Sequence, residues 1–245
     1  MKASPAEQAQ LLRLQSLDTR LQQLAHRLGS LPQAAPLAEL AKRDTAVRGS
    51  RSEAIGTLED ARAELKRLES DVAVVEARMS RDGDRLQHTS SVKDVAALES
   101  ELVSLQRRLG DLEEQELLVM ERVEEAEVAV ASIDLQRAAI ASEVATLEAE
   151  RDDAAGGLAV EREQTERDRG TIAGGISETL LAFYEQRRVR GGGVGAALLQ
   201  ARTCGGCGIT LTGSDLEAVG RAAPDEVVLC PECDRILVRT DESGL

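Results

Sequence analysis

The four cysteines of the chain are the residues best suited to specific chemistry, and they form two Cys-x-x-Cys pairs. Cys204 and Cys207 make the first pair, and Cys230 and Cys233 make the second after an interval of 22 residues. A Cys-x-x-Cys turn lets two sulfurs of one tight loop reach a single metal ion, and zinc favours four tetrahedral thiolates. The spacing therefore predicts one Zn²⁺ ion bound by all four cysteines. Because four thiolates leave no coordination position for water or substrate, the ion is expected to be structural.

The residues next to the cysteines, and the setting of the two pairs, bear on whether the pairs bind zinc, bind iron or act in redox chemistry. Gly208 and Asp234 each follow the second cysteine of a pair, and both tolerate the left-handed backbone conformation that such turns often need. Iron in the same four-sulfur geometry is the main alternative to zinc. A redox-active Cys-x-x-Cys would be expected in a thioredoxin-like βαβ setting, which the sequence lacks.

Residues 191–245 are predicted to form the zinc-ribbon domain. Short apolar runs at 209–211, 227–229 and 236–239 are typical of strands, and a loop at 215–225 would absorb the long interval between the cysteine pairs. A segment of this size buries too little surface to be stable alone, so the metal should contribute to its folding free energy.

The elements that must position this ribbon are helices. A first helix begins near Pro5 and carries leucines in steps of three and four residues. Gly29, Pro32 and Pro36 predict a break near residues 29–36, because proline removes a backbone donor and restricts the preceding residue. The leucine stripe of this helix consists of Leu14, Leu17, Leu21, Leu24, Leu28 and Leu31.

Two further helices carry a strict heptad stripe, as an antiparallel coiled coil requires. The second helix starts at about residue 37, and the third returns after a tip at residues 81–91, where Gly, Asp, Ser and Thr gather. Ser90 and Ser91 are candidate N-caps of the third helix. The predicted seam of the second helix is Leu40, Asp44, Val47, Arg51, Ala54, Leu58, Ala61, Leu65, Leu68, Val72, Val75 and Met79. The predicted seam of the third is Val95, Leu98, Leu102, Leu105, Leu109, Leu112, Glu116, Val119, Val123, Ala126, Val130, Ile133, Arg137, Ile140, Val144 and Leu147.

The third helix could continue to about residue 188, where three consecutive glycines follow. The glycine pairs at 156–157 and 174–175 would bend it or end it, since each glycine costs about 1 kcal/mol in a helix interior. The predicted fold is therefore mainly α: residues 1–190 form a long antiparallel coiled-coil hairpin, a helical rod, with a small C-terminal β zinc ribbon.

Composition agrees with a narrow helical core and limits the classes of partner. The chain has no Trp, one Tyr and one Phe, and its net charge is −14. Coating nucleic acid needs a basic surface, which argues against that role for the whole chain. No apolar run reaches the length of a membrane span, and the N-terminal residues lack the apolar core of a signal peptide. With cysteines spaced for metal, these features predict a cytoplasmic protein.

One basic cluster precedes the ribbon, formed by Arg187, Arg188, Arg190 and Arg202. These arginines could complement the C-terminus of a helix, or they could contact phosphate or a partner protein. Residues 203–245 themselves hold eight acidic residues and three arginines. That balance disfavours phosphate, although zinc ribbons frequently bind nucleic acid.

No pattern for catalysis emerges. The glycines at 191–195 lack the lysine and following helix of a P-loop, and neither His26 nor His88 has a second metal-binding residue nearby. The many Asp and Glu residues lie on predicted helix faces, where solvation and pairing are their ordinary roles. The sequence therefore does not predict an enzyme.

The order of these features resembles a bacterial family of coiled-coil proteins that end in a C4-type zinc ribbon. The resemblance is carried by YEQRRVRGGGVGAALLQARTCGGC, by EVVLCPECDRILVRTDESGL and, more loosely, by SSVKDVAALESEL after the tip. It implies a helical hairpin with a ribbon at its base and places the four cysteines at the family's ligand positions. It also marks Lys93 and Asp94 as candidate tip contacts. Nucleic-acid-binding and regulatory adaptor roles have been suggested for the family.

Three functions remain open from the sequence. The first is a non-catalytic adaptor whose ribbon and adjoining helix end dock a protein of the transcription or translation machinery. The second is a direct RNA or DNA binder that uses the four arginines. The third is a purely structural coiled-coil protein, and the coiled coil leaves homodimerisation open in each case.

Overall fold

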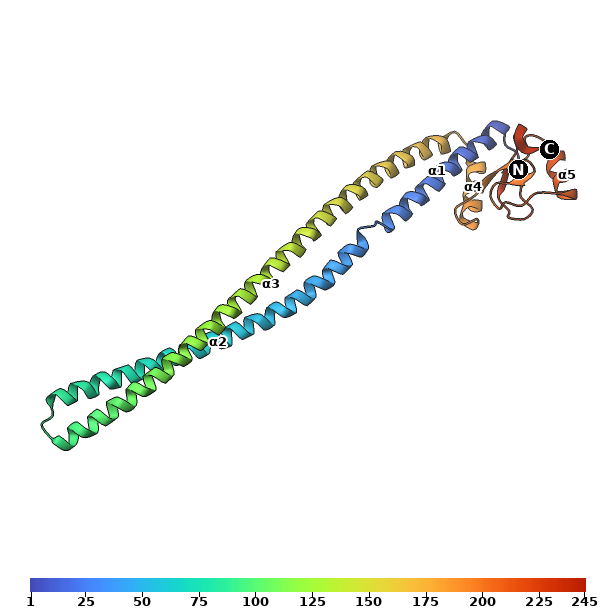
Figure 1. Ribbon diagram of the computed structural model, residues 1–245. Helices are drawn as coiled ribbons and strands as arrows, with labels where there is room; N and C mark the ends of the chain where they lie inside the picture. Colours follow the sequence, from blue (N-terminus) through green and yellow to red (C-terminus); the bar gives the residue numbers. More distant parts are fainter. The chain divides into compact units, whose positions relative to one another are not determined.

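The computed structural model describes residues 1–245 and divides into two compact units (Figure 1). The hairpin unit is Ala35–Glu148, and the base unit combines Met1–Ala34 with Ala149–Leu245. The base unit therefore contains the first helix as well as the cysteines, so this division differs from the expected boundary at residue 190.

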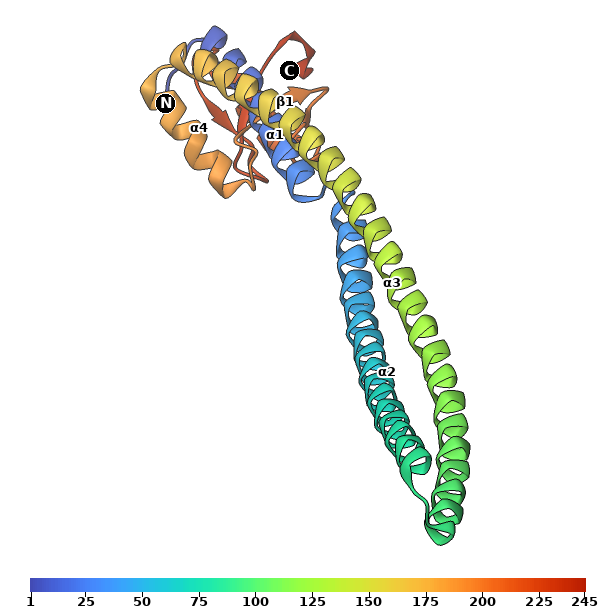
Figure 2. The ribbon, with the colours of Figure 1, turned by 90° about the vertical axis from the view of Figure 1, so that its left-hand side faces the viewer.

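The hairpin unit is built from α2 (Ala34–His88) and from α3 (Val92–Gly174) as far as Glu148, and the two helices run side by side in both views (Figures 1 and 2). The turn between them is residues 89–91, shorter than the predicted tip, because α2 continues through Gly83 to His88. Asp82 is buried in this last part of α2 and accepts a hydrogen bond from Arg85 at 3.3 Å. Ser91 caps α3, since its hydroxyl accepts from the backbone N–H of Asp94 at 3.4 Å.

The seam between α2 and α3 follows the heptad pattern closely. No residue of the two predicted stripes is exposed: each is buried or half-buried. Packing of this kind distributes stability along the helices, because every turn adds its own buried aliphatic side chains. The buried cluster nearest the tip contains Leu68, Val75, Leu105, Leu109, Leu112 and Val119.

Three of the four polar residues of the seam, Asp44, Arg51 and Arg137, take part in ion pairs between α2 and α3. Arg51 Nε lies 2.6 Å from Asp134 Oδ1, and Arg137 Nε lies 3.6 Å from Asp44 Oδ1. Polar groups at a few seam positions fix the register of a coiled coil. Asp44 and Arg51 therefore need no role beyond aligning α2 with α3.

The base unit begins with α1 (Pro5–Gly29), which Ser4 and Glu7 cap reciprocally. The break before α2 is residues 30–33, and Pro36 lies in the first turn of α2, where a missing N–H costs nothing. The buried face of α1 is rotated from the predicted stripe: Leu14 and Leu24 are buried, whereas the other stripe leucines are half-buried. Polar residues complete the buried face, which consists of Gln8, Leu11, Leu14, Gln15, Asp18 and Leu24.

The third helix does not extend to residue 188. It passes through Gly156 and Gly157 without ending, stops at Gly174, and is followed by α4 (Glu178–Arg190). Gly175 and Ile176 make the bend, because their N–H groups bond to carbonyls three residues earlier.

The C-terminal residues form a four-stranded sheet of order β2-β1-β4-β3. The strands are β1 (Ala196–Gln200), β2 (Thr203–Cys204), β3 (Val228–Leu229) and β4 (Ile236–Val238), and β1 runs parallel to β4. Two sequence expectations were wrong here. Residues 209–211 contribute only an isolated bridge from Thr210 to Thr203, and the expected loop at 215–225 contains α5 (Gly213–Arg221), which buries Val219. A short 3-10 helix, η1 (Asp241–Ser243), follows.

The two faces of the sheet belong to different cores. Ala196, Ile236 and Val238 pack with residues of α1 and α4, among them Leu14 and Tyr184. Ala197, Leu199 and Leu237 pack on the other face with Cys204, Cys230, Leu211 and Val219. Successive side chains of a strand point to opposite faces, so β1 and β4 each contribute to both cores. The ribbon is thus built onto the helices and shares a core with them.

Candidate metal centre

The four cysteine sulfurs lie together as one metal ion requires. Their Sγ atoms are all within 4.8 Å of one another, with Cys204 Sγ 3.9 Å from Cys233 Sγ and Cys207 Sγ 3.9 Å from Cys230 Sγ. Tetrahedral zinc with Zn–S bonds of about 2.3 Å places sulfurs roughly 3.8 Å apart. The observed spacing fits that geometry and is far too long for a disulfide.

The two Cys-x-x-Cys turns have the same backbone construction. The N–H of Gly208 donates to the Cys204 carbonyl at 2.8 Å, and the N–H of Asp234 donates to the Cys230 carbonyl at 2.9 Å. Gly208 (φ 75°) and Asp234 (φ 61°) both adopt the left-handed conformation, as the sequence predicted. The chain thus directs both sulfurs of each pair to one side of its turn.

The surroundings of the thiols explain why a cation is needed. Burial raises the pKa of the Cys204 thiol and raises that of Cys230 to about 12. Burial acts in the same direction on Cys233, but hydrogen bonds from Arg235, Cys230 and Cys207 lower its pKa to about 7. Four thiolates held this close together, two of them buried and two half-buried, are unstable without a positive charge among them, and a divalent ion supplies it.

Two arginines tie the second cysteine turn to α4. Arg235 donates to the carbonyls of Val194 (3.1 Å) and Gly191 (2.8 Å), and Arg187 forms an ion pair with Asp234. The guanidinium of Arg187 also lies over the Phe183 ring, 4.8 Å from its centroid. The metal centre is therefore anchored to the helix that precedes it.

The predicted arginine cluster is largely engaged inside the protein. Arg187 pairs with Asp234, Arg188 donates to Glu185 at 2.8 Å, and Arg202 donates to the Gly244 carbonyl at 3.0 Å. Arg190 is exposed and forms no ion pair. The structure places Arg187, Arg188 and Arg190 in the last turn of α4, where they complement the helix C-terminus.

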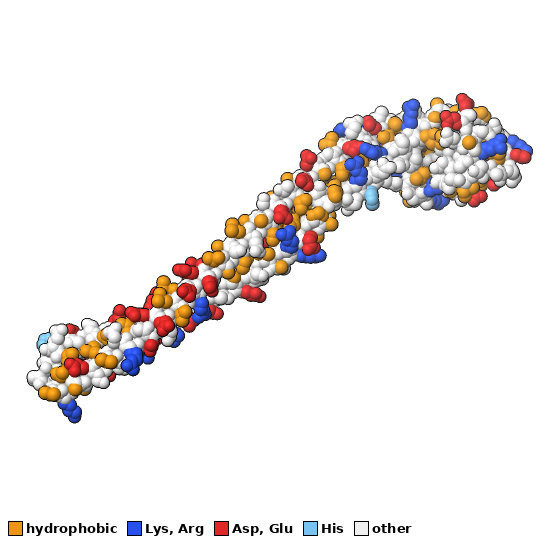
Figure 3. Space-filling model, viewed as in Figure 1, with side chains coloured by type: hydrophobic (Ala, Val, Ile, Leu, Met, Phe, Trp, Pro, Cys, Tyr) orange, Lys and Arg blue, Asp and Glu red, His pale blue; other side chains and the backbone are white.

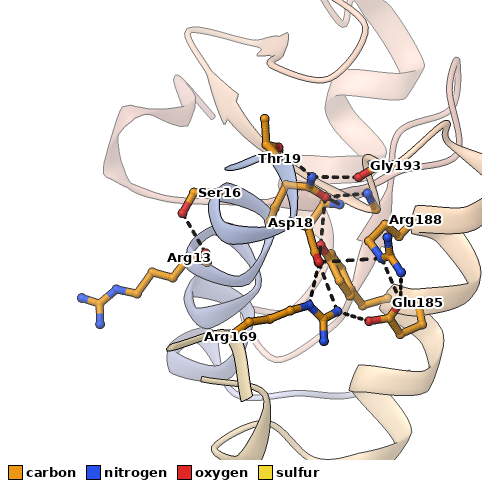
Figure 4. A network of polar contacts seen from close by, with 12 residues as sticks. Arg13, Ser16, Asp18, Thr19, Arg169, Glu185, Arg188 and Gly193 are labelled. Atoms are coloured by element: carbon orange, nitrogen blue, oxygen red, sulfur yellow. Dashed lines mark hydrogen bonds and ion pairs between the residues drawn. The ribbon is translucent and has the colours of Figure 1, made fainter. Parts of the chain in front are cut away.

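A buried polar network beside the ribbon was not predicted from the sequence (Figure 4). Asp18 of α1 is 4% exposed, and it accepts from the Tyr184 hydroxyl at 2.7 Å and from Arg169 Nε at 2.6 Å. Arg169 also pairs with Glu185. Asp18 thus joins α1, α3 and α4 at one point, and the hydrogen bond to Asp18 raises the pKa of Arg169 above its ordinary value.

The same network reaches the first strand of the ribbon through Gln15. Its Oε1 accepts from the N–H of Gly195 at 2.7 Å and lies 3.0 Å from the Tyr184 hydroxyl oxygen, and its Nε2 donates to the Gly193 carbonyl at 3.0 Å. Gly195 must be glycine, because a Cβ there would lie 2.7 Å from the Tyr184 carbonyl oxygen. One feature of the sequence could have indicated this network. The spacing of Gln8, Gln15 and Asp18 puts these polar residues on the same face of α1 as Leu11 and Leu14.

The predicted tip contacts lie at the start of α3 in the hairpin unit. Lys93 and Asp94 are exposed, and Asp94 lines a cavity of about 500 Å³ together with Arg78, Asp82, Arg85 and Glu101, among others. Arg78 pairs with Glu101 at 2.7 Å. The tip therefore belongs to the hairpin unit, whereas the cysteines belong to the base unit.

Comparison with known proteins agrees with this architecture. Residues 14–192 match the model of the CT398-like coiled coil hairpin domain, and residues 203–237 match that of the C4-type zinc ribbon domain. The chain therefore belongs to the CT398-like coiled-coil hairpin family and carries a C4-type zinc ribbon whose four cysteines are clustered for one metal ion.

Bacterial relatives share both parts. An uncharacterised protein of Mycobacterium tuberculosis is 34% identical over 242 residues, with 98% of each chain covered. A solved structure from Mycobacterium smegmatis is 34% identical, with a TM-score of 0.86 and coverage of 98% of this chain and 100% of the other. The structure of CT398 from Chlamydia trachomatis is 19% identical with a TM-score of 0.64 and covers 96% of this chain and 98% of its own, which supports the fold.

Neither matched domain is described by an activity. None of the helices combines the length and the apolar character needed to cross a membrane.

Proposed function

We propose that this protein is a non-catalytic adaptor, and that its zinc ribbon and the adjoining end of α4 dock a protein of the transcription or translation machinery. The observation that carries the proposal is the charge balance of residues 203–245. All three of its arginines have partners within the chain. Arg239 donates to the carbonyls of Ala222 (2.6 Å) and Glu226 (2.8 Å), and Arg235 donates to main-chain carbonyls. Arg221 is exposed but forms an ion pair with Glu217 on the same helix.

The carboxylates of the same segment are less engaged. Five of the eight have no ion pair: Asp215, Glu226, Glu232, Asp241 and Glu242. Zinc bound by four thiolates adds a net charge of −2 to this surface. Such a surface repels phosphate, so a protein partner is favoured over RNA or DNA.

The test is site-specific photocrosslinking in cells, with the crosslinker at Glu232 in the ribbon and, as a control, at exposed Val160 on α3. We expect protein adducts at Glu232 that persist after nuclease treatment and disappear in a Cys204→Ser variant. A partner recovered in this way is then purified and its binding measured directly. Adducts that contain RNA or DNA, or equal adducts at Val160, would contradict the proposal.

The nucleic-acid alternative makes a different prediction for the arginine cluster. Neutralising Arg190, which has no ion pair, would weaken RNA or DNA binding and reduce its salt dependence. An unchanged gel shift in an Arg190→Gln variant would exclude that version.

A further inference from the structure

The hairpin unit carries a second apolar stripe that faces away from its seam. Leu117, Val128 and Leu135 of α3 are 62%, 70% and 73% exposed. At about 100° per residue these three side chains lie within about 20° of one another around the helix, over roughly 27 Å of its length. Seam residues Val119 and Ala126 point about 160–180° away from them.

This stripe is unusual for a helix that already has a partner. Single exposed aliphatic residues are common, but a row on one side of an amphipathic helix marks an interaction surface. Val103, 63% exposed, extends the row two heptads toward the tip. No other segment of the hairpin unit covers this face, because α2 packs on the seam.

The stripe overlaps a strongly acidic segment of α3, which contains Leu117 and ends next to Val128. Residues 111–127 contain eight acidic residues and a single base, Arg122. Arg122 pairs with Glu64 on α2, and Glu127 pairs with Arg62. The other seven carboxylates have no ion pair: Asp111, Glu113, Glu114, Glu116, Glu121, Glu124 and Glu125. Figure 3 shows acidic side chains with apolar ones among them along this part of the hairpin.

We propose that this face of α3 docks a basic amphipathic helix of a partner protein. Aliphatic residues of the partner would cover Leu117, Val128 and Leu135, and its Lys or Arg residues would pair with the flanking carboxylates. A second copy of this chain fits poorly, because stripes brought together would place the unpaired carboxylates against one another. This surface lies in the hairpin unit and is independent of the ribbon.

The test uses full-length protein and a fluorescent synthetic peptide of leucine and lysine whose leucines follow heptad spacing. We expect the patterned peptide to bind at least tenfold more tightly than a scrambled peptide of the same composition. Leu117→Gln/Val128→Gln should weaken binding at least tenfold, whereas Val74→Gln, at an equally exposed position on α2 (64%), should leave it unchanged. All of these sites are exposed, so the variants should fold, which far-UV circular dichroism checks.

Charge is tested separately. Glu121→Gln/Glu124→Gln/Glu125→Gln should weaken binding and flatten its salt dependence more than the charge-matched control Glu59→Gln/Asp60→Asn/Glu69→Gln on α2. Equal binding of the scrambled peptide, or unchanged binding by Leu117→Gln/Val128→Gln, would overturn the proposal. So would a dimer in analytical ultracentrifugation that this double variant dissociates, because the occupant would then be a second copy.

Discussion

The hairpin unit and the base unit are stabilised in opposite ways. In the hairpin, one residue pattern repeats along α2 and α3, and the buried surface is spread over many positions of the seam, each of them buried or half-buried. In the base, a few unique groups hold several elements at once: the four cysteines, Tyr184 and Asp18. Single substitutions should therefore have local effects in the hairpin unit, whereas in the base unit one substitution should loosen several elements at once.

The largest expected effect is loss of the metal. Cys230→Ser should abolish stoichiometric zinc binding and unfold the ribbon, because structural zinc contributes about 10–16 kcal/mol in small zinc domains. The hairpin helices should remain folded. Mass spectrometry measures the zinc content, and far-UV circular dichroism measures how much helix remains. Thr210→Ser serves as the control for both measurements. Loss of most helical signal would contradict the independence of the hairpin.

Zinc binding should also release protons near pH 7. Cys204 and Cys230, whose pKa values are raised by burial, are protonated in the metal-free protein at this pH and must lose their protons to bind zinc. We therefore expect zinc affinity to fall as the pH falls. Calorimetry in buffers of different ionisation enthalpy measures the proton release, and a value near zero would contradict the buried-thiol description.

The next largest effect concerns the buried network. Asp18→Ala should destabilise the base by about 2–3 kcal/mol, because Arg169 and Tyr184 both lose their buried acceptor while Arg169 keeps its ion pair with Glu185. Tyr184→Phe should cost about 1–3 kcal/mol through an unsatisfied buried acceptor. Tyr184 is the only Tyr and the chain has no Trp, so tyrosine fluorescence reports the base alone for Asp18→Ala. Equal destabilisation by Asp134→Ala in the hairpin would remove the distinction between the units.

A smaller effect is expected at the turn between β1 and β2. Ala201 (φ 46°) and Arg202 (φ 66°) are both left-handed, and their N–H groups bond to the carbonyls of Glu242 and Ser243 at 2.8 Å. Ala201→Gly should stabilise the base by about 0.5–1 kcal/mol, because glycine adopts this conformation without strain. Ala197→Gly in β1 should destabilise it, and the two variants are compared by thermal unfolding.

The smallest effect lies in the hairpin seam. The hydrogen bond from Arg51 lowers the pKa of Asp134, so this pair stabilises the hairpin above the unfolded-state pKa of Asp and ceases to do so as the pH falls through the lowered value. Both side chains are partly exposed, so the pH dependence should be slight. Asp134→Asn should remove it, as thermal melts between pH 2 and pH 6 would show.

The hairpin could be predicted almost residue by residue, since its pattern is periodic and each position repeats the same physical requirement. Its tip was predicted less well, because Asp82 and Gly83 read as turn residues although the burial of Asp82 keeps them helical. The metal centre was also predictable, including the left-handed Gly208 and Asp234, because zinc chemistry restricts both residue type and spacing.

The junction between ribbon and helices could not be predicted. Strand β1 is recognisable only through its parallel pairing with β4, and the role of Gln15 depends on Gly193 and Gly195, which are distant in sequence. The turn of the buried face of α1 toward Gln15 and Asp18 follows from the same tertiary contacts. Local periodicity contains no information about such partners.

The central claim is that zinc folds the ribbon together with the helices that share its core. Hydrogen–deuterium exchange of the full chain, with zinc and after chelation, tests it most directly. We expect chelation to remove protection from β1 and β4 and also from Leu14 and Tyr184 in α1 and α4, whereas residues 58–119 of the hairpin should keep theirs. Loss of protection confined to residues 203–237 would contradict it.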